Sequence, residues 1–173
     1  MGGATVDTVP LDNLIGPAVV IDVVSQANAD RDYLASVEDL SKFEAEYGPI
    51  TSDDVVLIRT GWSSRWPNTL RYMGDDRPGR ADELYFPGIA PKLAEVLAQR
   101  EVKAVGIDTA SIDYGASQDF RTHQILMGAG VTGLENLMGL EALPARGAWV
   151  VALPMKIGAS SGAPARIAAL VRR

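Results

Sequence analysis

The chain contains a single histidine, His123, and a glutamate, Glu135, follows it twelve positions later. An imidazole and a carboxylate are common metal ligands, so this pair in a glycine-interrupted stretch could be half of a metal site. It cannot be a whole site, because protein metal sites usually use three or four protein ligands. The alternative is a helix histidine that bonds a backbone carbonyl, beside an unrelated surface glutamate.

Other residues near this pair narrow the chemistry. The chain has no cysteine, which excludes thiolate nucleophiles, disulfides and zinc–thiolate sites. The remaining carboxylates nearby, Asp108, Asp113 and Asp119, suit hard cations better than zinc. A serine–histidine nucleophile is disfavoured because no Gly-x-Ser-x-Gly turn is present. The loop from Gly158 to Pro164 could offer backbone N–H groups to an anion, but it lacks a nucleotide-binding spacing and a plain turn is favoured.

The elements that must position these residues alternate between strands and helices. Short runs rich in β-branched residues predict buried strands at residues 17–24, 54–60, 102–108 and 148–154. Apolar residues at helical spacing predict helices at 91–100, at 119–127 around His123, and from Ser36 to a stop at Gly48. Residues 63–87 are predicted to form a surface loop. For residues 165–171 the sequence does not decide between a helix and a last strand. The alternation predicts one α/β layered domain over residues 1–173.

Strand ends are the second place where chemistry is expected. In α/β sheets ligands tend to bind at the carboxyl ends of the strands. This rule draws attention to Thr60–Trp62, Asp108–Thr109 and Pro154–Lys156. The alternative is that these residues only form turns and pack the interior.

Composition limits the partners of the chain. The net charge of −6 argues against nucleic acid as a main partner, because phosphate binding needs a basic face. The sequence shows neither a signal-peptide pattern nor an apolar run long enough to span a membrane. We therefore expect a cytoplasmic protein with no membrane partner. The first residues read as a loop, which suggests that the chain opens in the middle of a fold.

Several strings together resemble the cyclase family of metal-dependent hydrolases, which includes bacterial kynurenine formamidases and isatin hydrolases. They occur in order over nearly the whole chain, and none is a generic turn. These strings are Gly2–Asp7, Pro10–Leu11, Leu14–Val23, Leu57–Trp62, Phe86–Gly88, Gly106–Asp113, Gly133–Leu137 and Leu153–Ile157.

The resemblance implies a swivelling β/β/α cyclase-like fold and a homodimer or higher oligomer. It implies one or two divalent ions, zinc or manganese, and cleavage of an aryl formamide or cyclic amide such as N-formylkynurenine, a compound of tryptophan catabolism. His123 and Glu135 match the family's metal-ligating pair. The residues expected to line an aryl amide substrate are Thr60, Trp62, Phe86 and Ser161.

One departure from the family changes the expected activity. The family's His-x-Gly-Thr-His-x-Asp-x-Pro-x-His motif, which supplies further ligands and a proton-transfer histidine, is absent from this sequence. The resemblance therefore predicts an N-terminally truncated domain whose metal is weakly bound or absent. The chain is expected to be inactive on its own as a hydrolase. The alternative is a non-catalytic remnant that acts as a binding or oligomerisation partner.

Overall fold

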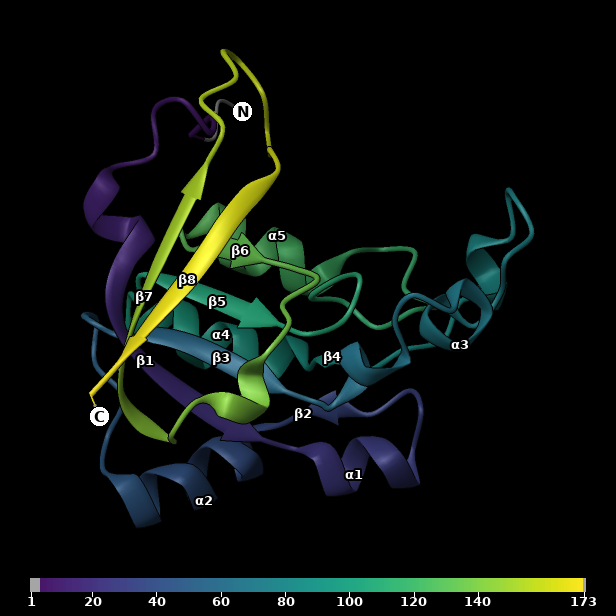
Figure 1. Ribbon diagram of the computed structural model, residues 1–173, viewed down its shortest axis with the longest axis horizontal. Helices are drawn as coiled ribbons and strands as arrows, with labels where there is room; N and C mark the ends of the chain where they lie inside the picture. Colours follow the sequence, from purple (N-terminus) through teal and green to yellow (C-terminus); the bar gives the residue numbers. More distant parts are fainter. Residues whose placement is uncertain (1–3, 173) are drawn as a thin grey trace.

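The computed structural model describes residues 4–172; Gly2 and Gly3, which begin one of the strings above, lie outside the described residues. Its centre is a six-stranded mixed sheet in the order β6-β5-β3-β1-β7-β8 (Figure 1). The strands are β1 (Ile15–Asp22), β3 (Val55–Arg59), β5 (Ala104–Ile107), β6 (Thr132–Leu134), β7 (Arg146–Pro154) and β8 (Ala165–Val171). The first four of these are parallel to one another, whereas β7 runs antiparallel to β1 and β8 antiparallel to β7. The predicted α/β class is confirmed.

The helices are α1 (Val24–Ala29), α2 (Val37–Tyr47), α3 (Thr69–Met73), α4 (Pro91–Gln99) and α5 (Arg121–Gly128). Helices α2, α4 and α5 pack on one face of the sheet. Side chains alternate along a strand, so Val19 and Ile21 of β1 join a core with α2, α4 and α5, while Ala18 and Val20 join a second core with β7. Burial on both faces explains why the central parallel strands read as continuous apolar runs.

Helix α2 follows the predicted start and stop signals. The hydroxyl of Ser36 accepts from the backbone N–H of Asp39, and the Asp39 carboxylate accepts from the backbone N–H of Ser36. This capping box satisfies two N–H groups that a helix end would otherwise leave without partners. The helix ends at Gly48, as predicted.

The structure settles one sequence expectation, corrects another and adds elements that were not predicted. Residues 165–171 form strand β8, which pairs with β7 along its length, so the strand alternative is right. The segment 63–87, predicted as a loop, contains α3 and forms a projecting arm (Figure 1). Neither α1 nor β6 was predicted: α1 has no side-chain cap and β6 is only three residues long. Strands β2 (Leu34–Ala35) and β4 (Gly88–Ile89) form a separate small sheet.

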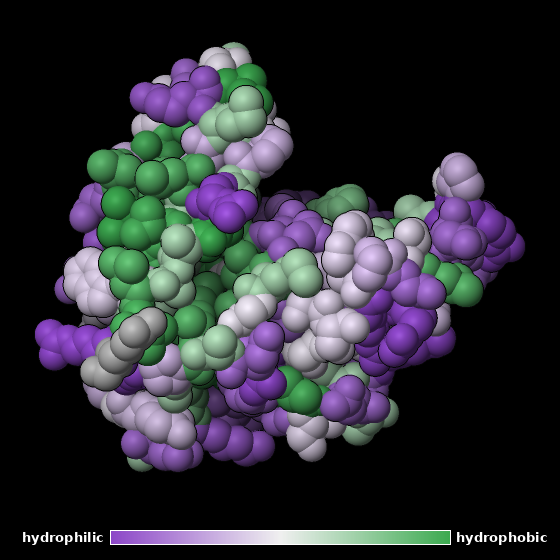
Figure 2. Space-filling model, viewed as in Figure 1, coloured by the Kyte–Doolittle hydropathy of each residue, from purple (hydrophilic) through white to green (hydrophobic). Residues whose placement is uncertain are grey.

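The outer face of the β7–β8 hairpin is apolar. Figure 2 shows a continuous hydrophobic surface over these two strands. Trp149 and Leu170 lie opposite one another in the ladder and are 51% and 65% exposed. Strand β8 is also the edge of the sheet. Among residues 4–172 no helix has the length and apolar character needed to cross a bilayer.

Candidate metal centre

His123 lies in the first turn of α5, and Asp113 holds the start of that helix. The residue before the helix, Phe120, has a positive φ of 50° and makes no side-chain cap. The Asp113 carboxylate takes over this role, because it accepts from the backbone N–H groups of Thr122 at 2.9 Å and His123 at 3.1 Å. A residue distant in sequence therefore fixes the backbone that carries the histidine.

The imidazole of His123 lies between two carboxylates. Its Nδ1 is 2.6 Å from Asp113 Oδ2, and its Nε2 is 3.2 Å from Glu135 Oε1. Glu135 follows β6, and its Oε1 also accepts from the backbone N–H of Ile112 at 3.1 Å. Asp113 is buried, whereas His123 and Glu135 are 34% and 31% exposed. The two predicted ligands therefore meet at a site that solvent can reach.

The two carboxylates shift the protonation of this cluster. The hydrogen bond to Asp113, followed by that to Glu135, raises the pKa of His123 to about 9, against a smaller opposing effect of burial. Burial raises the pKa of Asp113, but hydrogen bonds from the His123 ring and from two backbone N–H groups outweigh it, so this pKa lies below its ordinary value. A metal ion at Nε2 would have to replace the proton there, since only an unprotonated nitrogen coordinates.

The spacing of Nε2 and Oε1 can be compared with that of two ligands on one ion. For metal–ligand bonds of about 2.0–2.1 Å at a tetrahedral angle, the two ligand atoms lie about 3.3 Å apart. The observed 3.2 Å between His123 Nε2 and Glu135 Oε1 fits this spacing. Within residues 4–172 no group of three or more histidine, cysteine, aspartate or glutamate side chains is placed to hold an ion. His123 and Glu135 thus fit part of a ligand set.

The residues predicted to line a substrate lie in two different environments. The backbone N–H and hydroxyl of Thr60, at the end of β3, donate to Asp108 Oδ1 at 2.8 and 2.7 Å. Trp62 and Phe86 are almost fully buried in one aromatic cluster with Tyr72. Ser161 is exposed in the loop that joins β7 and β8. A lining role for these four residues stays a prediction.

Tyr72 links the strand ends to the glutamate. Its hydroxyl donates to Asn136 Oδ1 at 3.1 Å, and Asn136 directly follows Glu135 with a positive φ of 57°. Burial raises the pKa of Tyr72 to about 12, and the charges of Asp108 and Glu135 add to this effect. The phenol therefore stays protonated and able to donate at neutral pH.

Sequence reasoning named Asp113 only as a nearby carboxylate and did not connect it to His123. Its position just after a predicted strand was the available signal, but nothing in the spacing linked it to the imidazole. Tyr72 and Phe120 carried no signal at all. The Phe120 ring is 53% exposed and meets the His123 ring edge to face, with 6.1 Å between centroids.

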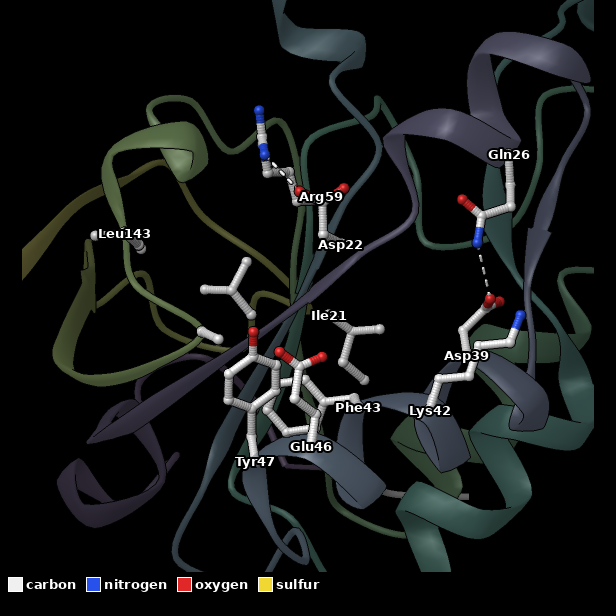
Figure 3. A pocket seen from close by; sticks show the side chains of 12 residues that line it. Ile21, Asp22, Gln26, Asp39, Lys42, Phe43, Glu46, Tyr47, Arg59 and Leu143 are labelled. Carbon is white, nitrogen blue, oxygen red and sulfur yellow. Dashed lines mark hydrogen bonds and ion pairs between the residues drawn. The ribbon is translucent and has the colours of Figure 1, made fainter.

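A separate hollow of about 310 Å³ lies between β1 and α2 (Figure 3). Phe43 and Tyr47 of α2 form one wall, and the Asp22–Arg59 ion pair lies at the ends of β1 and β3. Its lining includes no residue of the His123 cluster. We therefore treat it as a feature distinct from the candidate metal centre.

Comparisons with known proteins agree in both sequence and structure. The model of a family described as "Putative cyclase" matches residues 1–114. An isatin hydrolase of Roseibium aggregatum is 32% identical over 169 residues, 95% of this chain and 63% of that protein. A kynurenine formamidase of Paracidovorax citrulli is 34% identical over 164 residues, 95% of this chain and 67% of that protein.

Solved structures show the same fold. Isatin hydrolase A from Ralstonia solanacearum superimposes with a TM-score of 0.90 at 35% identity, over 99% of this chain and 66% of that one. A structure described as a potential metal-dependent hydrolase with cyclase activity gives a TM-score of 0.70 at 30% identity, over 96% and 70%. The predicted cyclase-like fold is confirmed. The chain spans about two thirds of the length of these relatives, and 63% of the first.

Proposed function

Because the chain belongs to the cyclase family, we propose that its function is metal-dependent hydrolysis of an aryl formamide or a cyclic amide, with N-formylkynurenine as the model substrate. The observation that carries this proposal is the 3.2 Å approach of His123 Nε2 to Glu135 Oε1. The names of its relatives, isatin hydrolase and kynurenine formamidase, support the same class of reaction.

The chain's own residues have distinct roles in this proposal. His123 would hold the ion through Nε2 and Glu135 through Oε1, and this nitrogen and oxygen set suits zinc and manganese alike. When bound, a divalent ion supplies hydroxide at neutral pH and polarises the amide carbonyl. Tyr72 keeps Asn136 in place, and Asn136 directly follows the metal-binding glutamate.

The surroundings of the centre suit an aryl group. The exposed ring of Phe120 lies beside His123 and offers an aromatic surface to a substrate. Thr60, Trp62, Phe86 and Ser161 are proposed as further substrate neighbours. Trp62 and Phe86 would support this region from the interior, since both are buried.

The ligand count sets the expected strength of metal binding. His123 and Glu135 are two ligands, and catalytic sites usually use three. We therefore expect the 173-residue chain alone to bind zinc weakly and to hydrolyse N-formylkynurenine no faster than background. The other donors would come from outside the described residues. The alternative, a non-catalytic binding partner, also stays a prediction.

The test measures metal content by elemental analysis, together with turnover of N-formylkynurenine and isatin with and without chelator. We expect substoichiometric metal in the chain alone and a loss of zinc binding in the His123→Ala variant. Stoichiometric metal with turnover that chelator abolishes would overturn the two-ligand account and leave the hydrolase proposal standing. Zinc binding that His123→Ala leaves unchanged would overturn the proposed centre.

A further inference from the structure

The loop that follows β5 contacts both proposed ligands through neighbouring residues. The Asp113 carboxylate bonds the ring and the backbone of His123, and the backbone N–H of Ile112 donates to Glu135 Oε1. One short segment thus touches two residues that lie twelve positions apart and belong to different elements. The distance between the ligands depends on how firmly this segment is held.

The small sheet and the arm hold this segment in place. The backbone N–H of Ile89 donates to the carbonyl of Ile112 at 2.8 Å, and the N–H of Gly115 donates to the carbonyl of Phe86 at 3.0 Å. A Cβ on Gly88 would lie 2.7 Å from the carbonyl carbon of Asp113, so the two backbones are in direct contact. These contacts therefore hold the backbone of the segment in place.

We propose that Asp113 is a positioning residue, which holds Nδ1 of His123 protonated and turns Nε2 toward Glu135, where a divalent cation would be held. This inference rests on the proposed function and goes beyond it, because it assigns the geometry of the centre to a side chain that does not touch the ion. A carboxylate that accepts from the far nitrogen fixes both the tautomer and the ring orientation of a metal-binding histidine.

The geometry allows Asp113 no other arrangement. Its two oxygens accept from the N–H of Thr122, the N–H of His123 and the ring Nδ1, and its side chain is 5% exposed. Two of these partners are backbone N–H donors, and the lowered pKa of Asp113 keeps its carboxylate ionised and able only to accept, so Nδ1 of the ring is the donor in the third contact. An amide at this position would carry one donor and one acceptor, and could not satisfy all three.

The experiment uses the single histidine as a probe. Side-chain ¹⁵N NMR of the metal-free chain, at a pH well above the imidazole pKa of about 9, reports which nitrogen of His123 carries the proton. We expect only the Nδ1–H form in the wild type and a mixture of both tautomers in Asp113→Asn. Asp113→Ala, which removes the acceptor entirely, provides a second variant. Asp119→Asn, an exposed change of the same type in the same segment, is the control and should match the wild type.

Zinc affinity is the second readout, measured by calorimetry on the same proteins. Asp113→Asn should weaken zinc binding by about 10- to 100-fold, whereas Asp119→Asn should leave it unchanged. An unchanged tautomer in both Asp113 variants, or an Nε2–H form in the wild type, would overturn the inference whatever the metal does. If the tautomer responds as expected but the wild type binds no zinc at all, the positioning role stands and the proposed metal function fails.

Discussion

His123, Glu135 and Asp113 form one unit at the scale of single residues. The imidazole bridges a buried carboxylate at 2.6 Å and a half-exposed one at 3.2 Å. The buried Asp113 orients the ring, and the partly exposed Glu135 lies beside Nε2 on the side that solvent reaches. This division of roles between two carboxylates is what distinguishes the cluster from an ordinary salt bridge.

Loss of the Glu135 carboxylate should weaken metal binding directly. Glu135→Ala removes one of the two proposed ligands, so we expect zinc affinity to fall by at least about 10-fold in calorimetry. Glu141→Ala, which removes an exposed glutamate six positions later, is the matched control. Equal zinc affinities in the two variants would argue against Glu135 as a ligand.

The hydroxyl of Tyr72 should contribute to stability. Tyr72→Phe removes the hydrogen bond from a buried phenol to the side chain of Asn136, which is itself exposed, and this should cost about 1 kcal/mol in the free energy of unfolding. Urea denaturation measures this cost. Tyr114→Phe is the control, because its hydroxyl makes no hydrogen bond within the described residues. A Tyr72→Phe variant as stable as the control would show that this bond contributes nothing.

At this scale the sequence predicted the pair but not its support. The separation of His123 and Glu135 was recognisable because two ligand types matched a family pattern. The contact of Asp113 with His123 depends on how α5 packs beside the loop after β5, and no local spacing encodes that packing. Side chains that act through tertiary contacts leave little trace in a single sequence.

The helix α2 illustrates how local signals act at the scale of elements. Asp39 accepts from Tyr33, Ser36 and Gln26, and it is almost fully buried. Burial raises the pKa of Asp39, but hydrogen bonds from Tyr33 and Ser36 outweigh this effect and hold the pKa below its ordinary value of 3.8. A lowered pKa in the folded state adds stability above the ordinary value, and this stability is lost as the pH falls through the folded value.

Replacement of Asp39 should therefore destabilise the protein in a pH-dependent way. Asp39→Asn should cost about 1–3 kcal/mol at neutral pH, because a buried acceptor is lost. The difference from the wild type should shrink as the pH falls below the ordinary carboxyl pKa. Glu38→Gln, an exposed change on the same helix, should stay within about 0.5 kcal/mol. A pH-independent difference in thermal or urea unfolding would contradict this account.

A substitution at Gly88 in β4 tests whether the position of the loop after β5 controls the position of His123. A Cβ at this position would press on the backbone of Asp113 and Tyr114, so Gly88→Ala should cost about 1–3 kcal/mol and alter the His123 ring resonances. Gly128→Ala is the control, because a Cβ there meets nothing within 4 Å. Unchanged His123 resonances in Gly88→Ala would show that the position of the loop after β5 does not control the His123 ring.

The elements that sequence predicted well are those with strong local patterns. Strands β1, β3 and β5 are apolar and β-branched, α2 has a capping box at its predicted start, and α4 begins at Pro91 as predicted. Strand β8 was ambiguous because its alanines favour helix, and pairing with β7 decides its conformation. Strands β2, β4 and β6 were missed because two or three residues carry no periodicity.

At the scale of the whole molecule, the β7–β8 hairpin leaves an apolar surface exposed. Sequence predicted a homo-oligomer, and this stays a prediction. The exposed Trp149–Leu170 pair on the β7–β8 hairpin offers apolar surface that such an association would bury (Figure 2).

Analytical ultracentrifugation provides the test of association. Leu170→Lys should raise the monomer fraction relative to the wild type, because a charge cannot be buried there without a partner. Leu70→Lys, on the projecting arm, is a control of similar exposure. A monomeric wild type at all concentrations, or equal effects of both variants, would contradict association through the hairpin.

The central claim is that His123 and Glu135 bind one divalent cation. It is tested most directly by following the side-chain nitrogens of His123 by ¹⁵N NMR during a zinc titration. The account predicts that Nε2 shifts on zinc binding while Nδ1 keeps its proton, and that Glu135→Ala moves this response to higher zinc concentration. Zinc binding that leaves Nε2 unchanged, or that proceeds equally well without Glu135, would contradict it.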